Sequence, residues 1–495
     1  MKIILYVFLL TSPFFLRSQA KYDYVWVLGY GIIASTPDSL IPYGGVLKDF
    51  TINPPEHTLH DFIIRRPKAC ISDKDGRLLA YTSGCGILNR DHQIMANGDS
   101  LNPGVVYNGF CEDVGAYPNW QTCLFLPHPE HDSLFYLFHL RADDWLWNPM
   151  NLLYSVIDAR GDDGKGAVLS KNTSVLSDSI YLGNYVHATR HGNGRDWWVV
   201  SPRRFKYDMH VTLFSPEGVV YQGLQEFDLP KIDSTCCISQ QGFSTDGSKY
   251  FRNTFEGLTI YNFDRCTGLF SDPAYLDWDS LPFGGGGMVT SPNNRFLYLS
   301  SGGELFQYDL WAPDLAASRL VVGTYDGTLA PYVANFFWMG RAPDGKIYMN
   351  SSYENYVLHV IHQPDSLGLA CQFEQHADTL PAVTSVLLPN FANYRLGALD
   401  PPCSVTTGEA LPAASVRAFP NPTNGQFTRE WGAALPGAKR LLWYDATGRC
   451  IGEAGVEAGA ASHTQSTRHW PPGLYFWSLR SEQGRNVAAG RVVVE

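Results

Sequence analysis

The stretch GFSTDGSKYFRNTF, residues 242–255, carries the pattern that decides the fold of this chain. A short strand-forming run is followed by the tight turn Asp246-Gly247 and by a second run rich in aromatic residues. The dipeptide Asp-Gly supplies the positive φ that a two-residue β-hairpin turn requires. The stretch therefore predicts two antiparallel strands joined by a tight turn.

The same pattern occurs five more times, usually with Asp-Gly, Asn-Gly or Asn-Asn at the turn. The other copies are CISDKDGRLLAYTSG (70–84), LFLPHPEHDSLFYLFHL (124–140), ATRHGNGRDWWVVSP (188–202), VTSPNNRFLYLSSG (289–302) and GRAPDGKIYMNSS (340–352). Their turns recur at intervals of roughly 50 to 60 residues, close to the period of a four-stranded propeller blade. Further strands of the blades are expected at 258–264, 304–310 and 356–363.

One such unit cannot bury both of its faces, so several units must pack around a common axis. The sequence therefore predicts an all-β fold with a β-propeller over residues 21–400. If residues 24–30 and 384–391 share a closing blade, the propeller has seven blades, which we favour; otherwise it has six. A series of β-sandwiches or a β-helix is the competing fold, but sandwich strands recur without this fixed turn signature.

Length and composition agree with this fold class. The chain has 495 residues, of which 14 % are aromatic, and it contains 46 glycines and 31 prolines. This mixture is typical of a turn-rich β protein, and the length allows one large domain and at least one small one. The formal net charge of −11 is spread along the chain without a cluster of Lys and Arg. We therefore expect no nucleic-acid partner, since phosphate binding needs a concentrated basic face.

The first 20 residues have the plan of a secretory signal peptide. Lys2 precedes an apolar run over residues 3–16, and a short polar segment ends at Ala20. We expect cleavage between Ala20 and Lys21. A membrane anchor is the alternative, but about 14 apolar residues interrupted by a proline are too few for a bilayer that needs about 20. No later segment is long and apolar enough to span, so no transmembrane segment is expected in the mature chain.

The ten cysteines all follow the signal, where export to an oxidising compartment permits disulfides. The even count favours pairing, but the sequence does not determine the connectivity. The cysteines form no CxxC pair, and the adjacent Cys236-Cys237 lacks nearby His or Cys at ligand spacing. We therefore expect neither a metal site nor a cofactor.

The end of the chain differs in composition from the propeller region. Residues 401–415, PPCSVTTGEALPAAS, are rich in Pro, Ala, Ser and Thr and indicate a linker. Residues 416–495 contain strand-like runs, most of them separated by turns, at 416–419, 440–445, 474–480 and 490–495. They predict a small immunoglobulin-like β-sandwich.

This last domain carries four ordered motifs: AFPNPTNGQF (418–427), LLWYDATGRCI (441–451), PPGLYFWSL (471–479) and a terminal valine strand. The set resembles the C-terminal sorting domain of the type IX secretion system. The aromatic-Pro-Asn-Pro-x-x-Gly turn, the Asp-x-x-Gly-Arg hairpin and the Gly-x-Tyr strand of that family are all present. The matching residues are Phe419, Pro420, Asn421, Pro422, Gly425, Asp445, Gly448, Arg449, Gly473 and Tyr475.

The resemblance implies export across the outer membrane of a Bacteroidota-type bacterium, with the outer-membrane secretion machinery as the partner of this domain. In that family the domain is typically cut off, and the protein is released or attached to surface lipopolysaccharide. We expect Asn421 to cap its turn and Gly425 to adopt a strained φ. Cys450 departs from the pattern, and the alternatives for it are a bond with Cys403 or burial.

The large region also resembles, more loosely, propeller-like ectodomains that accompany this sorting tag and have no assigned activity. The matching segments are 76–104, 189–200, 261–268 and 388–397. This second resemblance implies architecture only.

Asp143, Asp144, Trp145 and Trp147 are the residues we expect to contact a ligand. They lie in a longer loop between strands, where carboxylates beside exposed aromatic rings suit a glycan. Two adjacent acids lack the separation that a glycosidase uses, so no catalytic residue is predicted. His187, Arg190, His191 and Asp196 form a second cluster, but it coincides with a blade turn and is interpreted as structural.

Two further features have structural interpretations. Trp197 and Trp198 are expected to pack between blades. The four glycines at 284–287 are followed by no Gly-Lys-Ser/Thr and suit a close backbone approach near the axis.

The leading hypothesis is a secreted or cell-surface propeller that binds a glycan, peptide or protein without catalysis. The alternative is an extracellular propeller hydrolase or lyase acting on polysaccharide or peptide. A third view is a structural unit of an adhesive surface layer. The sequence leaves open whether the chain is an enzyme, because the scaffold carries no convergent catalytic set.

Overall fold

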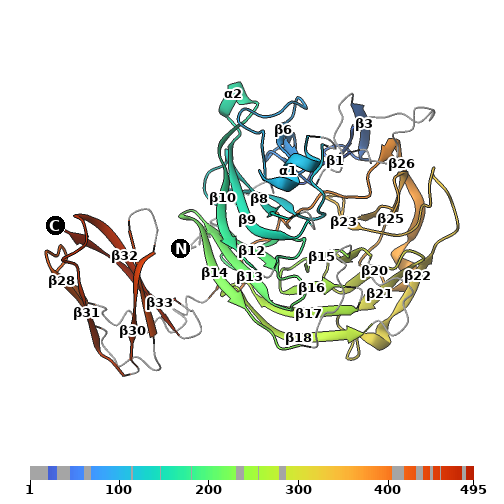
Figure 1. Ribbon diagram of the computed structural model, residues 1–495. Helices are drawn as coiled ribbons and strands as arrows, with labels where there is room; N and C mark the ends of the chain where they lie inside the picture. Colours follow the sequence, from blue (N-terminus) through green and yellow to red (C-terminus); the bar gives the residue numbers. More distant parts are fainter. Residues whose placement is uncertain are drawn as a thin grey trace, which may run out of the picture.

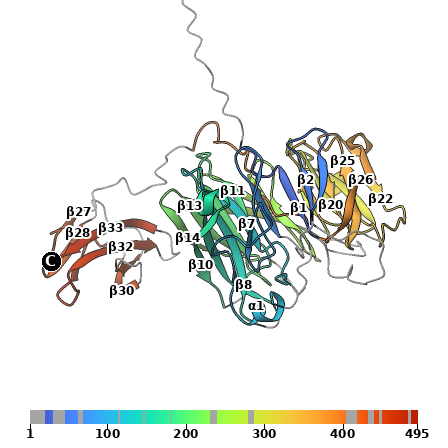
Figure 2. The same cartoon turned by 90° about the horizontal axis from the view of Figure 1, so that it is seen from above.

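The computed structural model describes most of the chain. The described residues are 20–29, 45–60, 68–112, 115–144, 147–179, 181–229, 239–254, 256–277, 286–403, 417–430, 439–445, 450–457, 459–481 and 486–495. They form a large lobe and a smaller C-terminal lobe (Figures 1 and 2). Residues 1–19 of the expected signal peptide lie outside this part of the chain, so cleavage between Ala20 and Lys21 stays a prediction.

Seven antiparallel sheets make up the described part of the large lobe. Two of them have three strands. The first consists of β1 (Val25–Leu28), β2 (Gly45–Asp49) and β3 (Glu56–His60), and the second of β4 (Ala69–Ser72), β5 (Leu78–Thr82) and β6 (Ile87–Asn89). The next two have four strands each. The third sheet consists of β7 (Cys123–Pro127), β8 (Leu134–Ala142), β9 (Pro149–Asp158) and β10 (Ala167–Ser177), and the fourth of β11 (His187–Arg190), β12 (Trp197–Pro202), β13 (Met209–Ser215) and β14 (Gly218–Gln225).

The last three sheets also have four strands. They are β15 (Gln241–Phe243), β16 (Lys249–Asn253), β17 (Gly257–Asp264), β18 (Leu269–Asp277); β19 (Met288–Thr290), β20 (Phe296–Ser300), β21 (Glu304–Asp309), β22 (Leu320–Thr324); and β23 (Met339–Arg341), β24 (Ile347–Met349), β25 (Asn355–Ile361), β26 (Phe373–Thr384). The short helices are α1 (Val105–Phe110), α2 (Gly161–Gly164), η1 (Ala316–Ser318) and η2 (Gly368–Cys371).

The seven sheets are the blades of a β-propeller. Within each sheet the strands pair in chain order, and the first strands of neighbouring sheets contact one another, as β11 contacts β15 and β15 contacts β19. The first strands therefore line the axis, and the blades are arranged around it in Figure 1. The predicted propeller is confirmed, with the favoured number of blades.

Each of the six predicted turns joins the first and second strands of a blade. In the copy quoted first, β15 pairs with β16 so that Phe243 lies opposite Tyr250, and Gly247 has a φ of 72°. The connection is longer than the predicted two residues, because β15 ends at Phe243 and β16 begins at Lys249. Asp246 explains the wider turn, since its Oδ1 accepts the Ser248 N–H at 2.9 Å.

The two segments expected to share the closing blade meet beside β1, but the prediction that they form one blade is wrong, because β1 pairs with β2 in its own sheet and residues 385–391 form no strand. The Ser385 N–H donates to the carbonyl of Gly29 at 2.6 Å, and the ring of Phe391 packs on Trp26 with centroids 6.0 Å apart. Lys48 in β2 then forms an ion pair with Asp378 in β26, with Nζ and Oδ2 2.8 Å apart. These contacts fasten the first blade to the last and close the ring without a covalent bond.

Residues 385–403, called here the axial segment, continue from β26 through the middle of the propeller. Asn390 Nδ2 donates to the carbonyls of Cys123 and Val186, which belong to different blades. Farther along, Cys403 forms a disulfide with Cys266 in the loop between β17 and β18. The segment thus joins several blades at their inner ends.

Aromatic side chains fill the spaces between blades. Trp197 and Trp198 are 0 % and 4 % exposed. Trp197 Nε1 donates to the carbonyl of Pro127 in the preceding blade, and Trp198 Nε1 donates to that of Arg265 in the following blade. Their predicted position between blades is confirmed.

The glycine run approaches other backbone closely. A Cβ on Gly286 would lie 1.8 Å from the carbonyl oxygen of Ser300, and one on Gly287 would lie 2.1 Å from that of Phe337. No side chain fits at either position, which confirms the expected close approach near the axis. The first two glycines of the run lie outside the described residues.

The smaller lobe is a sandwich of two sheets. One has the order β27 (Arg417–Phe419), β28 (Gln426–Glu430), β31 (Ser462–Ser466), and the other the order β30 (Cys450–Val456), β29 (Lys439–Tyr444), β32 (Gly473–Ser481), β33 (Asn486–Val494). The predicted sandwich is confirmed, although the sequence pattern did not predict β28, β30 and β31.

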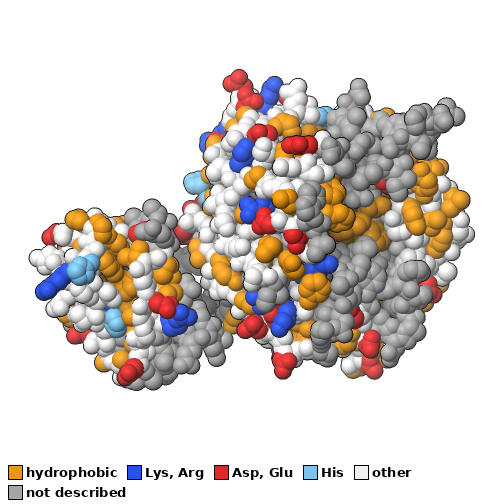
Figure 3. Space-filling view, in the orientation of Figure 1, with side chains coloured by type: hydrophobic (Ala, Val, Ile, Leu, Met, Phe, Trp, Pro, Cys, Tyr) orange, Lys and Arg blue, Asp and Glu red, His pale blue; other side chains and the backbone are white. Residues whose placement is uncertain are grey.

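Charged side chains of both signs are scattered over the face of the molecule shown in Figure 3.

The described residues contain two disulfides, Cys85–Cys111 and Cys266–Cys403. Both alternatives considered for Cys450 are wrong, because Cys403 pairs within the propeller and Cys450 is exposed. The reason is topological: Cys450 begins β30, an edge strand of the other lobe. Cys236 and Cys237 lie outside the described residues.

Candidate functional site

The loop between β8 and β9 contains the predicted ligand contacts. Asp143 forms an ion pair with Arg141, with Oδ1 and Nε 2.8 Å apart, and its Oδ2 accepts from Arg141 Nη2 and Asn151 Nδ2. Asp144 Oδ1 accepts the backbone N–H of Asn148 at 3.1 Å. Both carboxylates therefore shape the loop and are not arranged as an acid–base pair. Trp145 lies outside the described residues.

Trp147 is an exposed aromatic residue in the described part of this loop. Its side chain is 46 % exposed, and its ring lies edge-on to Phe110 with centroids 5.3 Å apart. Its backbone has a φ of 59°, and its carbonyl accepts from Asn119 Nδ2 at 2.6 Å. A bulky residue keeps positive φ only where its surroundings hold it there. Trp147 is thus a rigidly held aromatic surface.

Helix α1 contacts this surface through Phe110. Phe110 is its last residue, and the next residue, Cys111, is bonded to Cys85 before β6. Tyr117 ties the same region to the end of β8, because its hydroxyl contacts both the N–H and the carbonyl of Ala142. The sequence pattern did not predict α1, which is too short to show helical periodicity.

The second predicted cluster is dispersed by the fold. Arg190 stacks on the ring of Trp197 at 3.7 Å. His191 and Asp196 hold the turn between β11 and β12, where Asp196 binds Arg195 and His191 Nδ1 accepts the N–H of Asn193. His187 points elsewhere and lines the axial cavity described next. The structural interpretation of this turn agrees with these contacts.

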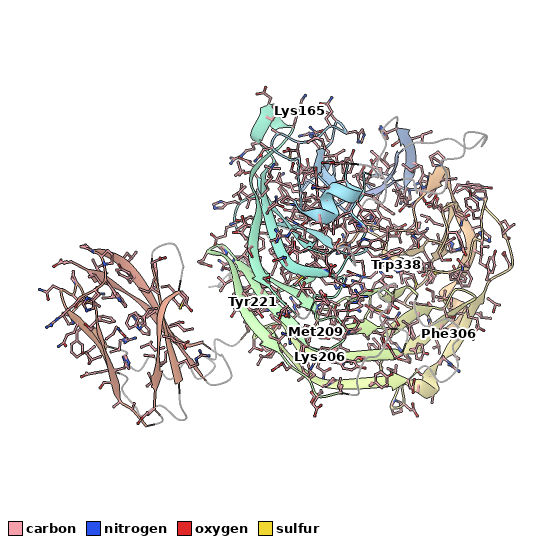
Figure 4. All side chains as sticks on the ribbon, in the orientation of Figure 1. Lys165, Lys206, Met209, Tyr221, Phe306 and Trp338 are labelled. Atoms are coloured by element: carbon pink, nitrogen blue, oxygen red, sulfur yellow. A yellow bond between two sulfur atoms is a disulfide. The ribbon has the colours of Figure 1, made fainter. Side chains whose placement is uncertain are left out.

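A cavity of about 100 Å³ lies on the propeller axis. Its walls come from β11, β15, β19, β23 and the axial segment, and its charged lining residues are Asp23, Arg341 and Arg395. Trp338, the residue before β23, lies near the middle of the ring in Figure 4. The sequence did not predict this site, because its residues come from separate blades and carry no common motif.

The sorting-motif turn is joined to the last strand. Asn421 Oδ1 accepts the N–H of Val493 at 2.9 Å, so Asn421 bonds to β33 in addition to any role in its own turn. Thr423 extends this pairing by donating its N–H to the carbonyl of Val493 at 2.8 Å. The strained φ predicted for Gly425 is wrong, since Gly425 does not have positive φ. Phe419, Pro420 and Pro422 form the exposed part of the turn.

The remaining motif residues lie around the second sheet. Asp445 directly follows β29, and Gly473 begins β32. Tyr475 is 7 % exposed, and its hydroxyl donates to the carbonyl of Pro471 at 2.7 Å. This bond holds the approach to β32 against the core. Gly448 and Arg449 lie outside the described residues.

Comparison with known protein families identifies the smaller lobe. Residues 417–495 match the family model described as a secretion system C-terminal sorting domain. The smaller lobe is a secretion sorting domain. The sorting domain implies interaction with the type IX secretion machinery and a location at the outer-membrane surface or outside the cell. No curated protein matches the chain in sequence.

Solved structures similar to the chain include several with low identity. A candidate 6-phosphogluconolactonase from Bacteroides fragilis is 12 % identical, with 76 % of this chain and 99 % of that chain covered and a TM-score of 0.43. Hydrazine synthase from Kuenenia stuttgartiensis is 12 % identical, with 72 % and 99 % covered and a TM-score of 0.39. TolB from Acinetobacter baumannii is 10 % identical, with 74 % and 64 % covered and a TM-score of 0.30.

Clusters of metal ligands and membrane-spanning helices are both absent from the described residues. No group of three or more His, Cys, Asp or Glu among them is placed to hold a metal ion. No helix in the same part of the chain has the length and apolarity needed to cross a membrane.

Proposed function

We propose that this protein is a binding module of the cell surface or medium, in which the sorting domain directs export and the propeller holds a ligand without catalysis. Residues 1–20 start the route as a cleaved signal peptide, and the sorting domain is later removed. We propose a glycan as the ligand, because the loop between β8 and β9 presents the exposed ring of Trp147 beside polar side chains.

The observation that carries the binding role is the fixed, exposed ring of Trp147. A sugar presents flat C–H faces that pack on an aromatic ring, and a ring already held in place loses little conformational entropy on binding. Phe110, α1 and the Cys85–Cys111 disulfide supply this rigidity. Functional loops are commonly held in this way by a rigid scaffold.

The roles of the nearby acids favour binding over hydrolysis. Asp143 is neutralised by Arg141 and hydrogen-bonded by Asn151, while Asp144 accepts a backbone N–H of its own loop. An acid–base pair for glycoside cleavage needs two carboxylates facing each other across the substrate. Asp143 and Asp144 instead bind groups of their own loop and its flanking strands.

The binding role is tested with Trp147→Ala and a glycan array. Residues 21–495 are screened first, and the affinity for any bound glycan is then measured for both forms. We expect Trp147→Ala to weaken binding by about tenfold or more, as loss of a central aromatic contact does. Trp311→Ala is the matched control, because Trp311 is 66 % exposed and follows β21 in another blade. Equal affinity of Trp147→Ala and wild type contradicts this site, and release of shortened glycan by the wild type contradicts the non-catalytic role.

The export role is tested by truncation. Ending the chain after Leu411 removes the sorting domain but keeps the propeller and both of its disulfides. We expect the truncated protein to accumulate in the periplasm, while full-length protein reaches the surface or medium. Equal amounts of both forms in the medium contradict the route.

A further inference from the structure

The axial cavity has an unusual balance of charge. Arg395 pairs with Asp23, with Nη1 and Oδ1 2.5 Å apart. Arg341, at the end of β23, donates from Nη1 to the Thr290 hydroxyl at 2.9 Å and makes a longer contact with the Thr290 carbonyl. Among the described residues, no carboxylate forms an ion pair with Arg341. The lining therefore carries two positive charges against one negative charge.

Arg341 remains charged in this position. Burial and the nearby positive charge of Arg395 lower the pKa of Arg341 to about 10, although the carboxylates of Asp23 and Asp246 act in the opposite direction. The guanidinium is therefore still protonated at neutral pH. A half-buried guanidinium with no carboxylate in direct contact retains part of its desolvation cost, so a site of this kind favours an anion. Thr290 accepts a hydrogen bond from only one nitrogen of Arg341, so other N–H groups of the planar guanidinium remain for a ligand.

The polar amides around the cavity are already used to build its wall. Gln240 Oε1 accepts the N–H groups of Met288 and Met339, and its Nε2 donates to the carbonyl of Met339. Asn390 bridges two other blades through its amide nitrogen. The shape of the cavity is thus held by bonds that a ligand does not need to break.

His187 presents a second polar group at the same cavity, from a different blade. Its side chain is 5 % exposed, its Nδ1 contacts the Tyr250 hydroxyl at 3.0 Å, and its Nε2 has no partner. Burial lowers the pKa of His187 to about 3, so the ring is neutral at pH 7. A neutral imidazole nitrogen is suited to a hydroxyl group and adds no charge.

We propose that the axial cavity binds a small hydroxycarboxylate, with the carboxylate on Arg341 and the hydroxyl on His187. The planar guanidinium matches the two oxygens of a carboxylate, and the single excess positive charge matches a monoanion better than phosphate. At about 10 to 15 Å³ per water-sized group, the cavity has room for several non-hydrogen atoms. This site is separate from the Trp147 loop, so the proposal does not depend on the glycan role.

The test measures binding of sodium lactate to residues 21–495. Thermal unfolding and calorimetry are recorded with lactate, acetate, phosphate and chloride at equal ionic strength. We expect a saturable rise in Tm with lactate, a weaker one with acetate, and only a general salt effect with chloride. A lactate effect equal to that of chloride overturns the proposal, and tighter binding of phosphate than of lactate overturns the assignment to a carboxylate.

Variants then assign the contacts. Arg341→Met should weaken lactate binding at least tenfold, whereas Arg295→Met should leave it unchanged, because Arg295 pairs with Asp309 away from the cavity. If Arg341→Met does not fold, Arg341→Lys decides, since it keeps the charge but loses the fork. Wild-type affinity in either Arg341 variant overturns the proposal. His187→Phe should reduce lactate binding to the level of acetate, and unchanged preference for lactate overturns the hydroxyl contact.

Discussion

The propeller and the sorting domain each draw an arginine away from solvent, Arg341 half-buried and Arg429 fully buried, but they accommodate it differently. In the sorting domain, Arg429 is 0 % exposed and lies over the rings of Trp443, Trp477 and Phe427 at 4.1, 5.4 and 5.5 Å. In the propeller, Arg341 faces a polar cavity on the axis. Aromatic faces satisfy the first charge within a packed core, so Arg429 has a structural role. The second charge has space beside it, which is what a binding site requires.

The difference extends to how the two domains are held together. The propeller is a ring whose ends are joined by contacts such as the Lys48–Asp378 ion pair, and the Cys266–Cys403 disulfide bonds its axial segment to a blade. The described part of the sorting domain has no disulfide, and its two sheets are held by a shared apolar core.

Acid should distinguish the domains most strongly. Burial lowers the pKa of His139 and His187 to about 3 and that of His359 to about 4 in the propeller. Their pKa values are below the unfolded value, so the unfolded chain binds more protons, and stability is lost as pH falls below about 6.5. Three such groups lower the free energy of unfolding by about 4 kcal/mol per pH unit near pH 5.

Burial and Arg429 also lower the pKa of His463 in the sorting domain, but this is a single group. Denaturant unfolding at pH 7 and pH 5, followed separately for each domain, checks the difference. His139→Gln should lower the number of protons that the propeller takes up on unfolding by about one, and the slope of its free energy of unfolding against pH falls accordingly. Equal acid sensitivity of the two domains contradicts this comparison.

Reduction should affect the propeller alone. The Cys266–Cys403 bond closes a loop with a sequence separation of 137 residues. In the chain-entropy model, a loop of this length contributes about 5 kcal/mol to the free energy of unfolding. We expect the double variant Cys266→Ser/Cys403→Ser to lower propeller stability by an amount of this order and to leave the sorting domain unchanged. The Cys85–Cys111 disulfide, which closes a shorter loop, is the control, and its removal should lower the free energy of unfolding by less.

Removal of the packed arginine should destabilise the sorting domain by a smaller amount. Arg429→Ala loses the contacts with three rings and leaves a cavity, at a cost of about 3 kcal/mol. Arg429→Met keeps most of the volume and should cost much less. Denaturant midpoints of the sorting-domain transition measure both effects. If Arg341→Ala in the propeller costs as much as Arg429→Ala, the contrast between a packed and a cavity-lining arginine is contradicted.

Local sequence predicted the inner half of six of the seven blades. A turn such as Asp246-Gly247 is specified by the φ preferences of two adjacent residues and by an Asp side chain that bonds two residues ahead. The same locality explains why the motif around Phe419 to Gly425 identified the sorting domain. It also explains the error in turn length, because the first strands end earlier than the turn residues alone indicate.

Other features depend on groups far apart in the chain. The disulfide partner of Cys403, the passage of the axial segment and the charge balance at Arg341 arise only when blades from opposite ends of the chain come together. The sequence by itself therefore determined a repeated hairpin, a propeller and a sorting tag, because each depends on short-range backbone preference or a contiguous motif, whereas it left the choice between six and seven blades open. Only the tertiary structure decided what lies on the axis, because its lining residues belong to separate blades and share no local pattern.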